Sequence, residues 1–100
     1  MKKLPKVKTW RELRTICNDE THSDCIRWRK VVVGTLENLG NPTLDKGDEV
    51  LWKRAWSGLQ EYISALVGEY GQSETKAERD ILAEVNHCRD LCDDVQLEKK

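Results

Sequence analysis

The 100-residue sequence has no phenylalanine, only two prolines and six glycines, and no long apolar stretch. No apolar run exceeds three residues, as in the valines at 31–33, whereas a membrane-spanning helix needs about 20. The basic start MKKLPKVKTW leads into no apolar segment, which argues against a signal peptide. Lys2 stands where N-myristoylation would require glycine. We therefore expect a soluble, cytoplasmic protein that does not associate with membranes.

What is present is a highly charged chain, with 38% apolar and 35% charged residues. Four tryptophans and two tyrosines supply all of its aromatic mass. A chain of this length forms one domain, residues 1–100, and can bury roughly 60–65% of its unfolded surface. Residues 1–30 hold nine Lys/Arg against four Asp/Glu, a net charge of +5, and residues 61–100 hold five against ten, or −5. Either the two ends lie close together and partly neutralise, or each end meets a different partner.

Helix-end signals are frequent in the sequence. TWRE at 9–12 predicts a capping box in which Thr9 and Glu12 exchange side-chain-to-amide hydrogen bonds. Ser23 or Asp24 is expected to cap a second helix, which Gly40 should end in a left-handed conformation.

Further along the chain, Gly71 is expected to end a third helix, and Ser73 or Thr75 to cap a fourth. TKAE at 75–78 predicts a second capping box there.

Apolar residues recur at helical spacing between these signals, and no alternating strand pattern competes. The third segment has the longest predicted inward stripe: Trp52, Trp56, Leu59, Ile63, Leu66, Val67 and Tyr70. Short connections favour antiparallel packing around one core. The prediction is an all-α, small four-helix bundle with helices at approximately 9–18, 24–39, 48–70 and 74–96. Residues 1–8 form a basic N-terminal arm and residues 97–100 a frayed tail.

The stretch VNHCRDLCDD places Cys88 and Cys92 on the apolar stripe that begins at Ile81 and Val85. We expect both thiols to be reduced, metal-free and largely buried, because free cysteine behaves as a small hydrophobe. His87 lies off this stripe and is expected at the surface.

Two other interpretations of the role of the cysteines remain open. A zinc site would add His22 and Cys25, which have a plausible ligand spacing in HSDC at 22–25, to the pair Cys88 and Cys92, with Cys17 as a further candidate ligand. A disulfide is the other alternative, although it would be unusual in a reducing compartment. We expect no cofactor.

No catalytic motif stands out. The chain lacks a glycine-rich phosphate loop, H-E-x-x-H and G-x-S-x-G. The aspartates near Cys88 and Cys92 would raise a thiol pKa and oppose nucleophilic chemistry. We therefore expect a protein that is not an enzyme and has no catalytic residues.

The tryptophans lie among basic residues, a composition typical of protein-binding hot spots. The leading hypothesis is a non-enzymatic helical interaction module, an adaptor or inhibitor of the kind found among small phage or viral accessory and regulatory proteins. Its predicted partner-binding residues are Trp10, Arg11, Arg14, Arg27, Trp28, Arg29, Lys30, Trp52 and Lys53.

Three alternatives remain. The tryptophans can simply fill the core in place of the missing phenylalanine. The basic residues 6–30 can bind nucleic acid. The chain can also form a homo-oligomer.

A faint family resemblance offers a further alternative. The basic start, a first helix ending TIC, a second opening DCIRW, and cysteines late in the last helix resemble a lentiviral matrix domain. The resemblance implies a retroviral-matrix-like structural role. The acidic last helix and the missing glycine at position 2 depart from that pattern.

Overall fold

A computed structural model describes residues 4–40 and 48–98, with the side chains of the second range described for residues 49–91. The helices are α1 (Trp10–Asn18), α2 (Cys25–Asn38), α3 (Asp48–Gly68) and α4 (Glu74–Glu98). The predicted all-α four-helix bundle is confirmed, and each predicted boundary lies within two residues of the observed one.

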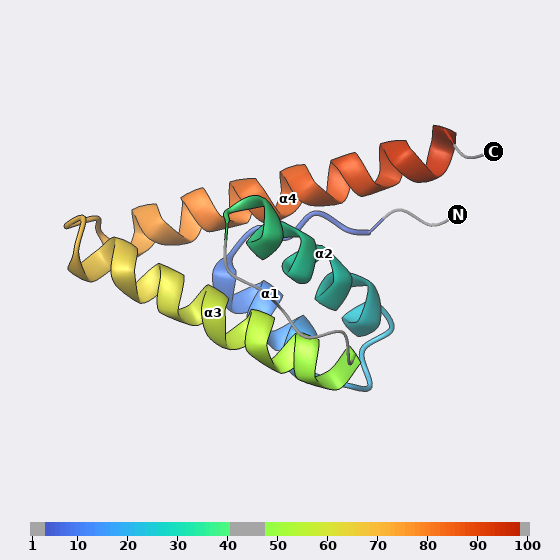
Figure 1. Ribbon diagram of the computed structural model, residues 1–100, viewed down its shortest axis with the longest axis horizontal. Coiled ribbons are helices and arrows are strands. Elements are labelled where there is room, and N and C mark those ends of the chain that lie inside the picture. The colour runs from blue at the N-terminus through green and yellow to red at the C-terminus, as the bar shows by residue number, and fades with distance from the viewer. Residues whose placement is uncertain (1–3, 41–47, 99–100) are drawn as a thin grey trace.

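The two longest helices, α3 and α4, form the arms of a V, and the other two helices pack between these arms at the open end (Figure 1). α3 and α4 diverge from the short turn that joins them, and α1 and α2 lie between them (Figure 1). α2 packs against each of the other three helices. It is therefore the central element, and its apolar side chains form much of the core.

The α1 start differs from the predicted capping box in one hydrogen bond. Thr9 Oγ1 accepts from the backbone amide of Glu12 at 3.0 Å, as expected. The carboxylate of Glu12, however, accepts from the amide of Lys8 at 3.4 Å and not from that of Thr9. The prediction was therefore wrong about the donor of the second hydrogen bond, which is the amide of Lys8 rather than that of Thr9.

The first turn of α4 is capped by Ser73, whose Oγ accepts from the amide of Lys76 at 3.1 Å. Thr75 lies inside the helix, so the second predicted capping box was wrong. Asp24 holds the N-cap position of α2 but makes no side-chain cap bond. The predicted left-handed glycines are confirmed, with φ of 78° at Gly40 and 65° at Gly71.

The chain before α1 packs along α4. Leu4 and Val7 are buried in the core. Asn86 Nδ2 donates to the carbonyl of Val7 at 3.2 Å, and Arg89 Nη1 donates to that of Leu4 at 2.8 Å. Arg89 also pairs with Asp90. These contacts place the described part of the arm antiparallel to α4.

One continuous core lies between the helices. Trp28, Leu13 and Leu36 are fully enclosed. From α4 the core receives Ile81 and Val85, the predicted stripe. Burying a side chain of this size contributes about 1.5–3 kcal/mol, so these few residues supply much of the stability.

The predicted inward stripe of α3 was wrong at its C-terminal end. Val67 is 38% exposed and Tyr70 is 70% exposed. Figure 1 shows the reason: at the α3–α4 turn only these two helices are present, because α1 and α2 lie nearer the wide end of the V. The end of α3 therefore has a single neighbouring helix to cover it.

Candidate interaction groove between α2 and α3

Three tryptophan rings form a stack that joins α1 to α3. The Trp52 and Trp56 centroids are 5.1 Å apart, and those of Trp56 and Trp10 are 5.4 Å apart. An arginine lies over each end, with Arg29 Cζ 4.8 Å from the Trp52 ring and Arg14 Cζ 5.7 Å from the Trp10 ring. Each ring pair and each cation–π contact typically contributes about 0.5–1.5 kcal/mol. Because Arg29 belongs to α2, these contacts connect α1, α2 and α3 and help to stabilise their packing.

The helical period explains this stack. Trp52 and Trp56 are four residues apart, so their rings share one face of α3. Both rings are half-buried, whereas Trp10 is only 3% exposed. The stack thus runs from the core toward the surface, and Trp52 is at its outer end.

Beside Trp52 the surface is hollowed between the first halves of α2 and α3. The hollow has a volume of about 480 Å³. We call it the α2–α3 groove. It is lined by Ile26, Arg29, Lys30, Val33, Glu49, Leu51 and Trp52.

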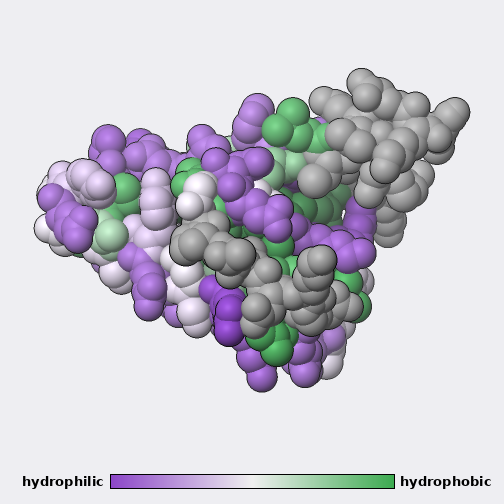
Figure 2. All heavy atoms as spheres, viewed as in Figure 1, coloured by the Kyte–Doolittle hydropathy of each residue, from purple (hydrophilic) through white to green (hydrophobic). Residues whose placement is uncertain are grey.

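The groove combines apolar surface with charged side chains of both signs. Ile26 is 68% exposed, an unusual position for a large aliphatic side chain. Arg29 and Lys30 oppose the single carboxylate of Glu49 among the lining residues. Figure 2 shows apolar side chains reaching the largely polar surface at the end of the molecule where α2 and α3 begin.

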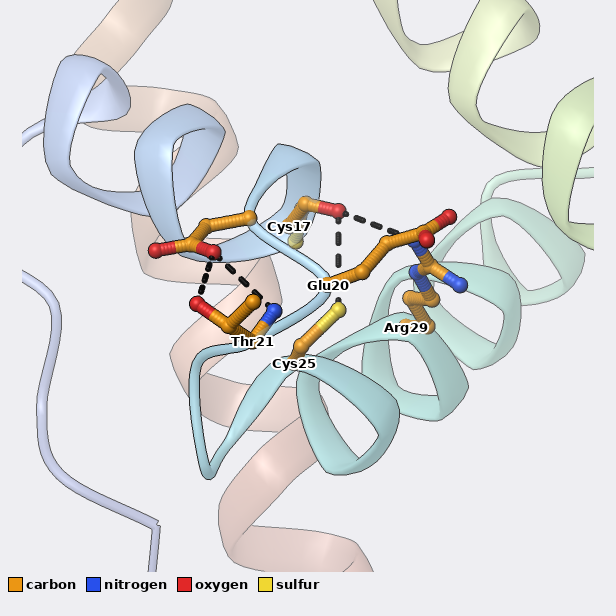
Figure 3. A network of polar contacts seen from close by, with 6 residues as sticks. Cys17, Glu20, Thr21, Cys25 and Arg29 are labelled. Atoms are coloured by element: carbon orange, nitrogen blue, oxygen red, sulfur yellow. Dashed lines mark hydrogen bonds and ion pairs between the residues drawn. The ribbon is translucent and has the colours of Figure 1, made fainter.

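Arg29 is held in place by the end of α1. Its Nη2 lies 3.5 Å from the carbonyl oxygen of Cys17, to which it donates, and 3.6 Å from a carboxylate oxygen of Glu20 (Figure 3). The thiol of Cys25 points at the same carbonyl, with its sulfur 3.7 Å away. The guanidinium is therefore positioned before any partner arrives, which lowers the entropic cost of using it for binding.

The buried Cys17 thiol, close to Arg29, is poorly suited to nucleophilic chemistry. Burial raises the pKa of Cys17 to about 12, and the neighbouring Cys25 thiol adds to the increase, while Arg29 opposes it. A thiol with such a pKa is protonated at neutral pH, and the thiolate is the reactive form. Among the residues whose side chains are described, no group of three His, Cys, Asp or Glu is arranged to hold a metal ion.

The structure places the predicted partner-binding residues in four environments. Trp10 and Trp28 are enclosed in the core, so their rings present almost no surface to a partner. Arg27 is half-buried and pairs with Asp24 at 3.4 Å. The exposed group is Arg11, Arg14 and Lys53, and the groove contains Arg29, Lys30 and Trp52.

Sequence reasoning missed the apolar residues of the groove, although α2 carried a signal for them. Ile26, Arg29, Lys30 and Val33 follow the spacing i, i+3, i+4, i+7, which defines one face of a helix. This face lies beside the core stripe that includes Trp28. A second amphipathic face on the same helix is the pattern that indicates an interaction surface.

On α4, the predicted burial of Cys88 is confirmed, with 5% exposure. Asn38 Nδ2 lies 3.2 Å from its sulfur, and a Cβ at Gly34 would lie 3.6 Å from the same atom. Cys92 lies outside the residues whose side chains are described. His87 is exposed, as expected.

Comparisons with protein-family models, curated proteins and solved structures return no match. Among the helices that the structure describes, none combines the length and apolarity required to cross a membrane.

Proposed function

We propose that this protein is a non-enzymatic helical interaction module, an adaptor or inhibitor that binds another protein through the α2–α3 groove. The observation that carries the proposal is the exposed Ile26 beside half-buried Trp52, next to a positioned arginine, Arg29. Tryptophan and arginine dominate the energetics of protein interfaces, especially where a pocket excludes water. A groove between two helices is also a common receptor for an amphipathic segment.

Binding to nucleic acid is less well supported. Stacking on bases requires accessible aromatic rings, and Trp10 and Trp28 are enclosed. Among the tryptophans, only Trp52 and Trp56 have partly exposed rings, and Glu49 beside Trp52 would repel a phosphate. The apolar lining of the groove favours a protein ligand over a polyanion.

A matched pair of variants tests the proposal. Ile26→Asp places a charge in the groove, and Tyr70→Asp places one at an equally exposed apolar position outside the groove lining. Both variants should fold, because neither side chain contributes to the buried core. We expect Ile26→Asp to weaken specific partner capture at least tenfold and Tyr70→Asp to leave it unchanged, as measured by quantitative affinity capture with mass spectrometry.

The proposal fails if Ile26→Asp retains every specific partner of the parent protein at parental levels. A titration with oligonucleotides at two salt concentrations separates the nucleic-acid alternative, whose affinity would fall steeply with salt.

A further inference from the structure

The charges that the α2–α3 groove leaves open to a partner are balanced. The guanidinium of Arg29 is already engaged, because it lies 3.6 Å from a carboxylate oxygen of Glu20 and covers the Trp52 ring (Figure 3). The other charged lining residues are Lys30 on α2 and Glu49 on α3. Both are exposed, and within the part of the chain that the structure describes neither forms a salt bridge. The groove therefore presents one unpaired cation on one wall and one unpaired carboxylate on the other.

This arrangement of charge is complementary to itself. A partner with charges of a single sign would attract one of the two side chains and repel the other, whereas a second copy of the groove offers both signs. A twofold axis along the groove would set α2 of one copy against α3 of the other, and so Lys30 against Glu49 at two symmetric places. A twofold axis across the groove would instead set Lys30 against Lys30. The charges therefore favour the axis along the groove.

The apolar side chains suit the same orientation. Ile26 and Lys30 are four residues apart, so they form one ridge on α2, and Ile26 is 68% exposed. When α2 of one copy lies over the groove of the other, this ridge packs between the two helices that form the groove walls. Ile26 then covers the half-buried Trp52 of the second copy. One orientation therefore buries the exposed apolar side chain and pairs both charges.

We propose that the α2–α3 groove binds the groove of a second copy in a twofold-symmetric dimer, with the ridge formed by Ile26 and Lys30 of each copy in the groove of the other. This inference rests on the groove of the proposed function, and the dimer and a protein partner compete for it. The groove has seven described lining residues on each copy. A stable interface uses about 20–30 residues on each side, so the dimer is weak and depends on concentration.

Two charge reversals in the full chain test this geometry. The Lys30→Glu dimer would bring carboxylates together at both symmetric places, and the Glu49→Lys dimer would bring lysines together. We expect each variant to dimerise at least about tenfold more weakly than the parent, because two attractive pairs become repulsive. An equimolar mixture of the two variants should form a heterodimer about as stable as the parent dimer, because each glutamate then faces a lysine. Sedimentation velocity over a concentration series measures all four samples.

Lys53→Glu is the matched control, because it reverses an exposed cation of α3 that does not line the groove. It should dimerise like the parent, and equal weakening by Lys53→Glu and Lys30→Glu would mean that net charge rather than pairing controls association. Circular dichroism first establishes parental helicity for every variant. High salt should weaken the heterodimer of the mixture, because its charge pairs lie at the rim of a small interface.

Three further results would overturn the inference. They are a parent protein that stays monomeric up to millimolar concentration, a Lys30→Glu variant that dimerises like the parent, and a mixture that associates no better than its two components.

The two proposals can fail separately. If the parent stays monomeric while Ile26→Asp loses its specific partners, only the dimer is wrong. If the charge variants and their mixture behave as expected but Ile26→Asp retains every specific partner, the groove serves self-association and the proposed function is wrong.

Discussion

The two long sides of the bundle differ in how completely they bury their apolar residues. On the closed side, formed by α1, α2 and α4, the side chains of Trp28, Val32 and Val85 have no exposed surface. On the open side, formed by α3, only Ala55 and Leu59 are buried among residues 49–68. Apart from Leu59, the large apolar side chains of α3 are half-buried or exposed, even though the helix is longer than α2.

Under the proposed function, this difference assigns stability to the closed side and binding to the open side. The closed side supplies the well-packed core, where loss of atoms leaves cavities. The open side contributes Trp52, whose ring is supported on one face by Trp56 and covered in part by Arg29. An aromatic ring held in one orientation at the surface binds a partner with little loss of side-chain entropy. The incomplete burial of α3 is therefore the feature that makes it suitable for recognition.

The largest expected change in the free energy of unfolding comes from replacing one tryptophan on the closed side, and one on the open side, with alanine. Trp28→Ala should lower the free energy of unfolding by about 3–5 kcal/mol, because it removes a fully enclosed ring. Trp52→Ala should cost about half as much, since its ring is half-exposed and its contacts are the stack and Arg29. Urea unfolding monitored by circular dichroism measures both.

Equal losses for the two variants would show that the open side is packed as firmly as the closed side. The m-values should match that of the parent protein, so that the midpoints report stability alone.

The sequence predicted the fold well because its helix signals are local. The capping threonine Thr9 and the left-handed Gly40 specify helix ends through bonds to neighbouring residues, and the apolar period specifies the inward face. The errors arose where distant segments decide burial. Whether Tyr70 is covered depends on how far α1 and α2 extend along the V, which periodicity does not encode.

The candidate site was predicted only in part for the same reason. Basic residues around Trp28 drew attention to this part of α2, and Arg29 and Lys30 do line the groove. The ring of Trp28 points into the core instead. The groove itself arises from the pairing of α2 with α3, so Leu51 could be recognised as a lining residue only from the three-dimensional arrangement.

A smaller effect compares two residues of α4 that lie three positions apart. Cys88→Ala should lower the free energy of unfolding by about 1–2 kcal/mol, because the sulfur fills space between α4 and Gly34. Leu91→Ala should cost less than about 0.5 kcal/mol, because its side chain is 44% exposed. Thermal unfolding of both variants under the same reducing conditions provides the comparison. A larger loss for Leu91→Ala would mean that the end of α4 is covered in solution.

The last effect is an alkaline loss of stability on the closed side, at the contact between α1 and α2. The pKa of Cys17 is about 12 in the folded chain, mainly because the thiol is buried, compared with an ordinary value of 9.0. A group whose folded pKa is raised stabilises the fold fully below its unfolded pKa, and that contribution is lost as pH rises above it. Between pH 8 and pH 10 the parent protein should therefore lose roughly 1 kcal/mol through this group.

Cys17→Ala provides the control, because it removes this thiol. Its stability should be lower than that of the parent at pH 8 but should fall less steeply toward pH 10. Denaturant unfolding at both pH values, with a phosphine reductant to keep the thiols reduced, measures the difference between the two slopes. Identical slopes would show that Cys17 ionises as readily in the folded chain as in the unfolded one, and that the junction of α1 and α2 admits water to the thiol.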